Sequence, residues 1–386
     1  MPCLAWAQKK ELSQARSYIK SGKDFDKAEK LMTGLLKDTA NRGDERIYQV
    51  WAEAVHRQYL AANERLYLKQ KQDTAAFFAL GRRLFTILEH LDSLDMRPDK
   101  KGRVKLDHRD KSVRLLDPLR NNLFNGGSFF VRKSDWKQAF DYMDTYVDCA
   151  RQPLFEAQRY ESTDGRLPEA AYWATYSAYR MNDADLTLRH SRLAVRDTAR
   201  CQFALQFIAE ACLWKADTAA YMATLQEGFS RYPRFPYFFP RLVDAYNAQG
   251  LYDRALAACD SALAVDDSSQ LFLFAKSSAL LRLRQYSECI DVCDRLIQLN
   301  DSMPEPYFNA ATAFISLAEG LDAKNEKRLV EMSYQSARLY MERYRKLKPD
   351  EQRKWAPVLY RIYLNLNMGR QFDEIDRLLK DDVKNK

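Results

Sequence analysis

The sequence predicts an all-α solenoid, in which antiparallel helix pairs stack in succession and bury their apolar faces only against one another. Three observations support this fold class. A pattern of small and apolar residues recurs every 34 residues over the second half of the chain. Hydrophobic residues make up 46% of 386 residues, enough for an extended core. Only 12 glycines and 12 prolines interrupt the helical patterns.

The 34-residue frame is clearest from Pro168 onward, and each frame holds two amphipathic stretches joined by a short turn. One column of equivalent positions contains small or modest residues: Thr175, Ala209, Val243, Ser277 and Ala311. A second column is mostly small: Ala194, Gly228, Ala262 and Leu296. The next column is apolar: Val195, Phe229, Leu263 and Ile297. Small side chains allow two helices to approach closely, and the apolar column fills the gap to the next pair.

The frame from Pro236 to Ser269 shows the pattern most fully. It contains small and aromatic residues at the expected places: Tyr246, Gly250, Tyr252, Ala255 and Ala262. This frame resembles the tetratricopeptide repeat, although Asp267 stands where that repeat usually has proline. The resemblance implies a right-handed superhelix whose concave face binds extended peptides. The segments NERLYLKQ, PDKKGRVK and NNLFNGGSFF are also similar to a group of Gram-negative bacterial repeat proteins.

We divide the chain into three parts: residues 1–8, residues 9–118 and a repeat array over residues 119–386. Residues 9–118 are predicted to be divergent helical repeats, with long helices at 45–62 and 74–94. The basic segment 97–120 has nine Lys or Arg against four Asp and is expected to be a solvated loop. An attraction to acidic partners is its alternative role.

The array from residue 119 is predicted to begin with a pair over 121–150, in which Gly126 and Gly127 permit close helix approach. About 14 residues around QPLFEAQRYESTDG are inserted before the Pro168 frame. The Pro304 frame is stretched near AKNEKRLVEM, and 355–366 with 372–379 form a last pair. The charged residues 380–386 suit a C-terminal cap. We expect about seven or eight helix pairs in all.

The first residues raise the question of export. Ala5-Trp6-Ala7 followed by Gln8 resembles the end of a signal peptide, so residues 1–8 are interpreted as a possible remnant of one. We therefore expect a periplasmic or otherwise exported protein, with a cytoplasmic location as the alternative because no basic start or full apolar core precedes Ala5. No window reaches the length of apolar sequence that a membrane-spanning helix needs.

Candidate binding residues lie on the first helix of each frame, which faces the inner side in proteins with this repeat. Tyr172, Tyr176 and Tyr179 recur at helical spacing beside Arg180, and Tyr and Arg are favoured binding residues. Packing against the neighbouring repeat is the alternative for these tyrosines. The same reasoning selects these residues from later frames: Trp214, Arg241, Asp244, Asn247, Phe274, Arg282 and Asn309. The family's carboxylate clamp, built from lysines and asparagines, is not reproduced.

No catalytic, cofactor-binding or metal-binding motif is found in the sequence. The seven cysteines and four histidines show no metal-ligand spacing, and most cysteines are expected to be buried. We predict a non-enzymatic scaffold that binds a protein or peptide, with no nucleic-acid partner, no cofactor and an undetermined oligomeric state. A glycan-binding protein using Tyr172, Tyr176 or Trp214 is the first alternative, and a helical-repeat hydrolase is the second.

Overall fold

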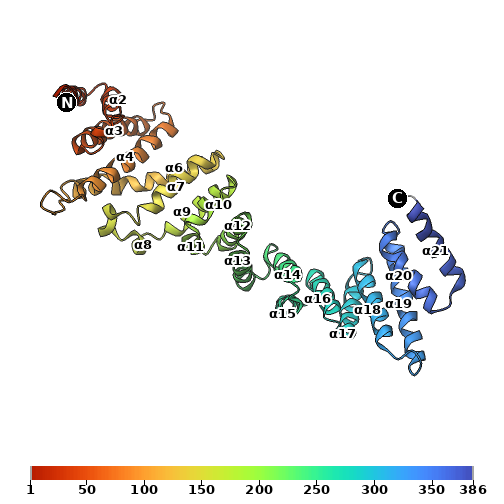
Figure 1. Cartoon of the computed structure of the whole chain (residues 1–386). Coiled ribbons are helices and arrows are strands. Elements are labelled where there is room, and N and C mark those ends of the chain that lie inside the picture. The colour runs from red at the N-terminus through yellow and green to blue at the C-terminus, as the bar shows by residue number, and fades with distance from the viewer. Residues whose placement is uncertain (1, 385–386) are drawn as a thin grey trace. The chain divides into compact units, whose positions relative to one another are not determined.

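The computed structural model describes residues 2–384, and across that range it consists of helices and turns without a strand (Figure 1). The predicted all-α class is therefore confirmed. The chain forms two compact units, Met1–Tyr221 and Met222–Lys386. The predicted boundary between residues 118 and 119 falls within the first unit. It rests on the regularity of the repeats and not on compactness, so it stays a prediction. No helix among the described residues has the length and apolarity needed to cross a bilayer.

The first unit contains four helix pairs followed by a single helix. Its α-helices are α1 (Pro2–Lys20), α2 (Phe25–Leu35), α3 (Glu45–Tyr67), α4 (Thr74–Asp95), α5 (Arg109–Leu116), α6 (Arg120–Arg132), α7 (Trp136–Asp148), α8 (Tyr160–Thr163), α9 (Leu167–Arg180), α10 (Ala184–Arg189), α11 (Ser191–Ala194) and α12 (Cys201–Trp214). Three 3-10 helices accompany them: η1 (Thr39–Asn41), η2 (Asp117–Leu119) and η3 (Pro153–Gln158). The pairs are α1 with α2, α3 with α4, α6 with α7, and α9 with α10 and α11.

The second unit begins within α13 (Thr218–Arg231), so the division between the units falls inside that helix. Its further helices are α14 (Phe238–Ala248), α15 (Tyr252–Leu263), α16 (Gln270–Arg282), α17 (Tyr286–Leu299), α18 (Glu305–Gly320), α19 (Lys327–Leu347), α20 (Gln352–Asn365) and α21 (Gly369–Lys384). Consecutive helices from α14 to α21 pack against one another.

The turn between the two helices of a pair repeats the same backbone geometry. Residues Asn182, Ala216, Gly250 and Arg284 stand 34 positions apart, and their φ angles are 56°, 55°, 70° and 61°. In each turn the next amide donates a hydrogen bond back into the first helix, as from Leu251 to the carbonyl of Tyr246 (2.9 Å). This left-handed C-terminal motif ends a helix and satisfies its last carbonyls. The 34-residue period is thus a property of the backbone.

The predicted small columns lie in the core. Thr175, Ala209, Ser277 and Ala311 have no measurable exposure, and the same holds for Ala194, Ala262 and Leu296. Six cysteines are free and buried, as the sequence indicated: Cys149, Cys201, Cys212, Cys259, Cys289 and Cys293. The side chain of Cys3 lies outside the described residues. Small buried groups at equivalent positions allow the helices of each unit to approach closely.

Two glycines mark close contacts between a helix and an aromatic ring of the next helix. A Cβ on Gly126 of α6 would lie 2.8 Å from the ring of Tyr142 on α7, which confirms the predicted role of this glycine in helix approach. A Cβ on Gly228 of α13 would lie 2.3 Å from the ring of Phe238 at the start of α14. Neither position accepts a larger residue without movement of an aromatic ring.

The irregular segments were predicted in part. The inserted residues form η3 and α8, and the turn residues Ser134 and Asn182 are accordingly 48 positions apart. The long helices expected at 45–62 and 74–94 are α3 and α4. The prediction of a solvated loop over 97–120 is wrong from Arg109 onward, because α5 forms there and contacts α4. At the N-terminus, the backbone of residues 2–7 belongs to α1, but Met1 and the side chains of residues 2–7 lie outside the described part of the chain. At the C-terminus, the side chains of the predicted cap after Lys380 also lie outside it.

Candidate partner-binding face

Helix α9 separates small residues from aromatic residues. Ala170, Ala171, Ala174 and Ala178 are fully buried, and α9 packs against α7, α10 and α11. The aromatic residues of α9 pack instead toward Trp136 of α7 and toward α12. The helical period therefore places the predicted tyrosines together, as the sequence indicated.

We define the aromatic face by the rings that contact one another around α9: Trp136, Tyr172, Trp173, Tyr176, Tyr179, Phe207 and Trp214. Tyr179 stacks on Phe207 with 4.5 Å between ring centroids and on Trp214 with 5.5 Å and an interplanar angle of 11°. Trp136 meets Tyr176 edge to face at 5.5 Å. Such contacts stabilise the rings and hold them rigid.

Two arginines border the aromatic face. The guanidinium of Arg180 lies 4.4 Å from the ring centroid of Trp136 and donates a hydrogen bond of 2.8 Å to the Tyr176 hydroxyl. Arg200 lies 5.6 Å from the Tyr172 ring and is paired with Asp197 at 2.8 Å. Arg180 is exposed and has no carboxylate partner among the residues that the structure describes, so it is the cation available to a ligand.

Exposure separates the predicted residues of this face. Tyr172 is 7% exposed, and burial raises the pKa of its hydroxyl to about 12. Tyr176 and Tyr179 are half-buried, whereas Trp214 is 41% exposed. Tyr172 is therefore a packing residue, Trp214 and Arg180 can contact a partner, and Tyr176 and Tyr179 support them from behind. A sugar ring could stack on Trp214 but not on the buried Tyr172.

The predicted residues of the second unit lie on the first helices of three pairs. Arg241 of α14 stacks over Tyr237 at 3.9 Å and donates to its carbonyl, so its guanidinium is partly engaged. Asn309 of α18 donates 3.0 Å to the hydroxyl of Ser277 on α16, which gives it a structural role. Three other predicted residues are exposed or half-buried on α14 and α16: Asp244, Phe274 and Arg282.

Asn247 of α14 is the remaining predicted residue of the second unit. Its side-chain oxygen is buried and has no hydrogen-bond partner among the described residues. A buried acceptor without a donor costs free energy, and a ligand donor could satisfy it. That these residues of α14, α16 and α18 bind a partner stays a prediction.

The sequence had not indicated Trp136, Trp173 and Phe207 of the aromatic face, nor Arg200 at its border. The repeat frame contained a signal for Phe207, because Trp173, Phe207 and Arg241 stand 34 positions apart and form one column. Trp136 lies on α7, the second helix of its pair, and Arg200 lies in the turn before α12. The predicted residues were all chosen from the first helices of the pairs.

The chain's similarity to known proteins is structural. No protein-family model and no curated protein matches it. Among solved structures it is similar to the C-terminal part of a TPR repeat-containing protein from Cytophaga hutchinsonii, with 12% identity, 65% of this chain and 92% of that chain covered, and a TM-score of 0.44. It is also similar to the TPR domain of P58(IPK) (12% identity, 97% and 99% covered, TM-score 0.27) and to yeast Tom70 (10%, 98% and 91%, 0.35).

Left-handed turns recur at 34-residue intervals, and the small columns between the helices are buried. The fold is an α-helical repeat of antiparallel helix pairs, similar to that of tetratricopeptide-repeat proteins. The helix pairs α14 with α15 and α16 with α17 follow the tetratricopeptide pattern most regularly, and α1 to α8 depart from it through long helices and insertions.

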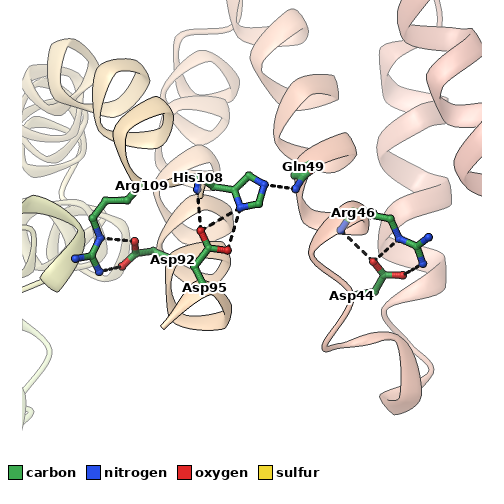
Figure 2. A network of polar contacts seen from close by, with 7 residues as sticks. All are labelled: Asp44, Arg46, Gln49, Asp92, Asp95, His108 and Arg109. Carbon is green, nitrogen blue, oxygen red and sulfur yellow. Dashed lines mark hydrogen bonds and ion pairs between the residues drawn. The ribbon is translucent and has the colours of Figure 1, made fainter. Parts of the chain in front are cut away.

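One departure from the tetratricopeptide pattern is a polar network between α3, α4 and α5 (Figure 2). Asp95 accepts hydrogen bonds from the backbone amide of His108 (2.9 Å) and from its Nδ1 (2.9 Å). The Nε2 of His108 lies 2.5 Å from the side-chain amide of Gln49. Arg109 forms two parallel hydrogen bonds of 2.8 Å with Asp92. The network anchors the start of α5 to the end of α4 and to α3.

Two groups of side chains in the first unit have the composition of cation ligands. Glu45, Asp95 and His108 form one group, and Asp144, Asp148 and His190 form the other. In the second group, Arg189 Nε lies 2.9 Å from Asp144 and Arg189 Nη2 lies 2.5 Å from Asp148. An arginine thus already compensates those carboxylates, and a metal ion would have to displace it.

Proposed function

We propose that this protein is a non-enzymatic interaction scaffold that binds a peptide or protein partner on the aromatic face of its first unit. The observation that carries the proposal is the exposure of large apolar side chains on α12: Leu213 is 53% exposed and Trp214 is 41% exposed. Trp214 is stacked on Tyr179, which is itself stacked on Phe207. An exposed ring held rigid from behind binds with little loss of conformational entropy.

The chemistry of the face indicates the kind of segment it would bind. Trp214 and Leu213 offer apolar area, and the neighbouring helix presents Arg180, whose guanidinium can donate two parallel hydrogen bonds to a carboxylate. The partner is therefore proposed to present an apolar side chain together with an acidic group. No chemistry is required of the scaffold itself.

The experiment is affinity capture with quantitative mass spectrometry, comparing the wild-type protein with a Trp214→Ala, Arg180→Ala double variant. We expect the specific partner to be recovered at least about tenfold less with the variant, because an aromatic anchor and a charge-assisted contact are lost together. The captured protein is then expressed, and its binding to both forms is measured in isolation by calorimetry.

The matched control is Leu329→Ala with Arg328→Ala on α19, which removes an exposed apolar side chain and an exposed arginine from the second unit and should leave partner recovery unchanged. Circular dichroism should show unchanged helix content for both double variants. Equal affinity of the purified partner for the wild type and for the Trp214, Arg180 variant would overturn the proposal. Tyr176 is unsuitable as the altered residue because it packs against Trp136, Trp173 and Phe207.

Glycan binding is a second candidate, and the exposed ring of Trp214 is the observation that favours it. Sugar rings stack on exposed indoles, and the test is an oligosaccharide array with the wild type and Trp214→Ala. Binding that depends on Trp214, without a protein partner, would support this candidate instead.

Export of the scaffold is proposed from the Ala5-Trp6-Ala7 pattern, and its test is the mature N-terminus measured by mass spectrometry of the native protein.

A further inference from the structure

The first unit contains a pocket that the aromatic face does not include. It has a volume of about 760 Å³ and is lined by residues of α1, α3, α4 and α5. That volume lies in the range of small-molecule sites, which extends from about 300 to 1,000 Å³. The pocket is therefore large enough for an organic molecule rather than a single ion.

The lining is strongly basic. Arg16, Arg57, Lys111 and Arg114 contribute four positive charges and Glu53 contributes one negative charge, so the formal balance is 4 − 1 = +3 with the histidines neutral. Arg57 lies 4.0 Å from Glu53. Within the described part of the chain, no hydrogen bond or ion pair is found for the side chains of Arg16, Lys111 and Arg114.

This lack of partners contrasts with the other cations near α4 and α5. Arg109 is held by Asp92, and Arg120 is held by Asp164 at 2.7 Å. Unpaired cations that converge on a pocket repel one another, and an anion between them relieves that repulsion. His56 lies on the same wall, and burial together with the charge of Arg57 lowers its pKa. The pocket thus has a positive field in which an anion is favoured.

Part of the remaining lining is apolar. Val50 of α3 and Leu88 and Leu91 of α4 are buried core residues that reach the pocket, and Leu60 is exposed at the α3 side. An ion as strongly hydrated as free phosphate gains nothing from such surfaces. An apolar group bound against the leucines would be removed from water, which contributes roughly 25 cal/mol per Å² buried.

The network in Figure 2 anchors helix α5, which carries Lys111 and Arg114 of the pocket lining. Asp95 is 5% exposed and fixes both the backbone and the ring of His108, which itself lines the pocket. Lys111 and Arg114 are three residues apart on α5, so they share one helix face. The backbone of α5 that carries these two cations is therefore fixed relative to α4 before a ligand binds, so only the two side chains lose freedom on binding.

We propose that this pocket binds an amphipathic organic anion, with its anionic head between Arg16, Lys111 and Arg114 and its apolar body against Leu88 and Leu91. Carboxylate and phosphate heads share the required chemistry: both are planar or tetrahedral arrays of acceptor oxygens for basic side chains. The site is distinct from the aromatic face, so the proposal does not depend on the interaction function.

The test is titration calorimetry of the full-length protein with decanoate and decyl phosphate, each below its micelle concentration. We expect saturable binding of at least one anion, and at least about tenfold weaker binding of the neutral probe decanol, because the unpaired cations would gain nothing from it. The two anions distinguish a carboxylate head from a phosphate head. Acetate and inorganic phosphate test whether the apolar body is needed, and both should bind at least about tenfold more weakly.

The decisive variant is Lys111→Gln with Arg114→Gln, which removes two exposed cations that have no described partner and so leaves the fold intact. We expect at least about a tenfold loss of affinity for the anion. Lys23→Gln with Lys37→Gln removes the same charge away from the pocket lining and should leave affinity unchanged. The proposal is overturned if no anion binds saturably, if decanol or the short anions bind as well as the long anions, or if the Lys111, Arg114 variant retains wild-type affinity.

Discussion

The two units of this protein are stabilised in different ways. Five acidic, basic or imidazole side chains are buried among the residues described, and all of them lie in the first unit: Asp92, Asp95, Arg120, His190 and Asp197. The buried polar residue described in the second unit is Ser277, whose hydroxyl donates to a carbonyl of its own helix. The second unit instead buries apolar and small side chains, and its part of the columns, such as Ala262 and Ser277, continues from α9 to α12 of the first unit.

The difference follows from what a repeat can supply. A regular repeat provides the same packing contact several times, so helices can be joined by small apolar groups alone. Where insertions and long helices break the frame, backbone ends and turns enter the interior, and charged side chains satisfy them. The example is Arg120, which donates to the carbonyl of Tyr146 (3.1 Å) and to Asp164 (2.7 Å) between the rings of Tyr146 and Tyr160. The basic pocket lies in this irregular part of the first unit, whereas the aromatic face lies mainly on α9 and α12, which belong to the regular frames.

The largest expected effect tests a small buried position of the second unit. Ala255→Arg in α15 should destabilise the protein by about 5 kcal/mol or more, because the substitution both overfills a position with no exposure and buries an unpaired charge. Denaturant unfolding followed by circular dichroism measures the change. Ala257→Arg on the exposed face of the same helix should change stability by less than about 0.5 kcal/mol. Similar losses for the two variants would show that the burial of Ala255 does not decide the loss of stability.

The next effect tests the buried charges of the first unit. Arg120→Met should cost about 3–5 kcal/mol, because it leaves the Asp164 carboxylate and the Tyr146 carbonyl without their cation. The double variant with Asp164→Asn should recover part of the loss, and a double-mutant cycle in urea measures the coupling. A loss below about 1 kcal/mol for Arg120→Met would mean that the ion pair is not a main stabilising contact.

A smaller effect should depend on pH. Burial, with a contribution from Asp148, raises the pKa of Glu89 to about 7 from an ordinary value of 4.5. Because the folded state holds this proton more tightly than the unfolded state, the destabilisation from ionised Glu89 develops between pH 4.5 and 7 and is complete above that range. Glu89→Gln should therefore raise the free energy of unfolding by about 1–3 kcal/mol at pH 8 and leave it nearly unchanged at pH 4. An equal gain at both values would exclude ionisation as the cause.

The smallest effect concerns the turns of the regular frames. Arg284 adopts φ of 61°, where a side chain is strained and glycine is not. Arg284→Gly should therefore stabilise the second unit by up to about 1 kcal/mol, and Gly250→Ala at the equivalent turn should destabilise it by about as much. Thermal melts of the two variants measure these opposite shifts. Shifts of the same sign would show that backbone strain does not decide stability at these turns.

The sequence predicted those features that the chain repeats. The positions of Thr175, Ala209, Ser277 and Ala311 could be read as one column because four independent copies agree, and all four are buried. Helical periodicity also placed Tyr172, Tyr176 and Tyr179 on a common face. It could not show that Phe207 of another helix covers Tyr172, because the crossing of α9 and α12 decides that contact.

The features that occur once were not predicted. The basic segment 97–120 was interpreted as a loop because its charges have no amphipathic period. Its helix α5 depends on two contacts with α4, from His108 to Asp95 and from Arg109 to Asp92, whose partners stand 13 and 17 positions apart. Such single contacts across a loop leave no periodic signal. The basic pocket depends on the same contacts and was missed for the same reason.

The left-handed turns have a consequence for the detection of related chains. Of the four turn residues spaced by one period, Gly250 is the glycine, and Asn182, Ala216 and Arg284 occupy the same conformation. A comparison by letters that expects glycine at this place penalises the other three copies, although their backbones are alike. Distant relatives of this protein should therefore be found more readily through recurring dihedral angles than through conserved letters.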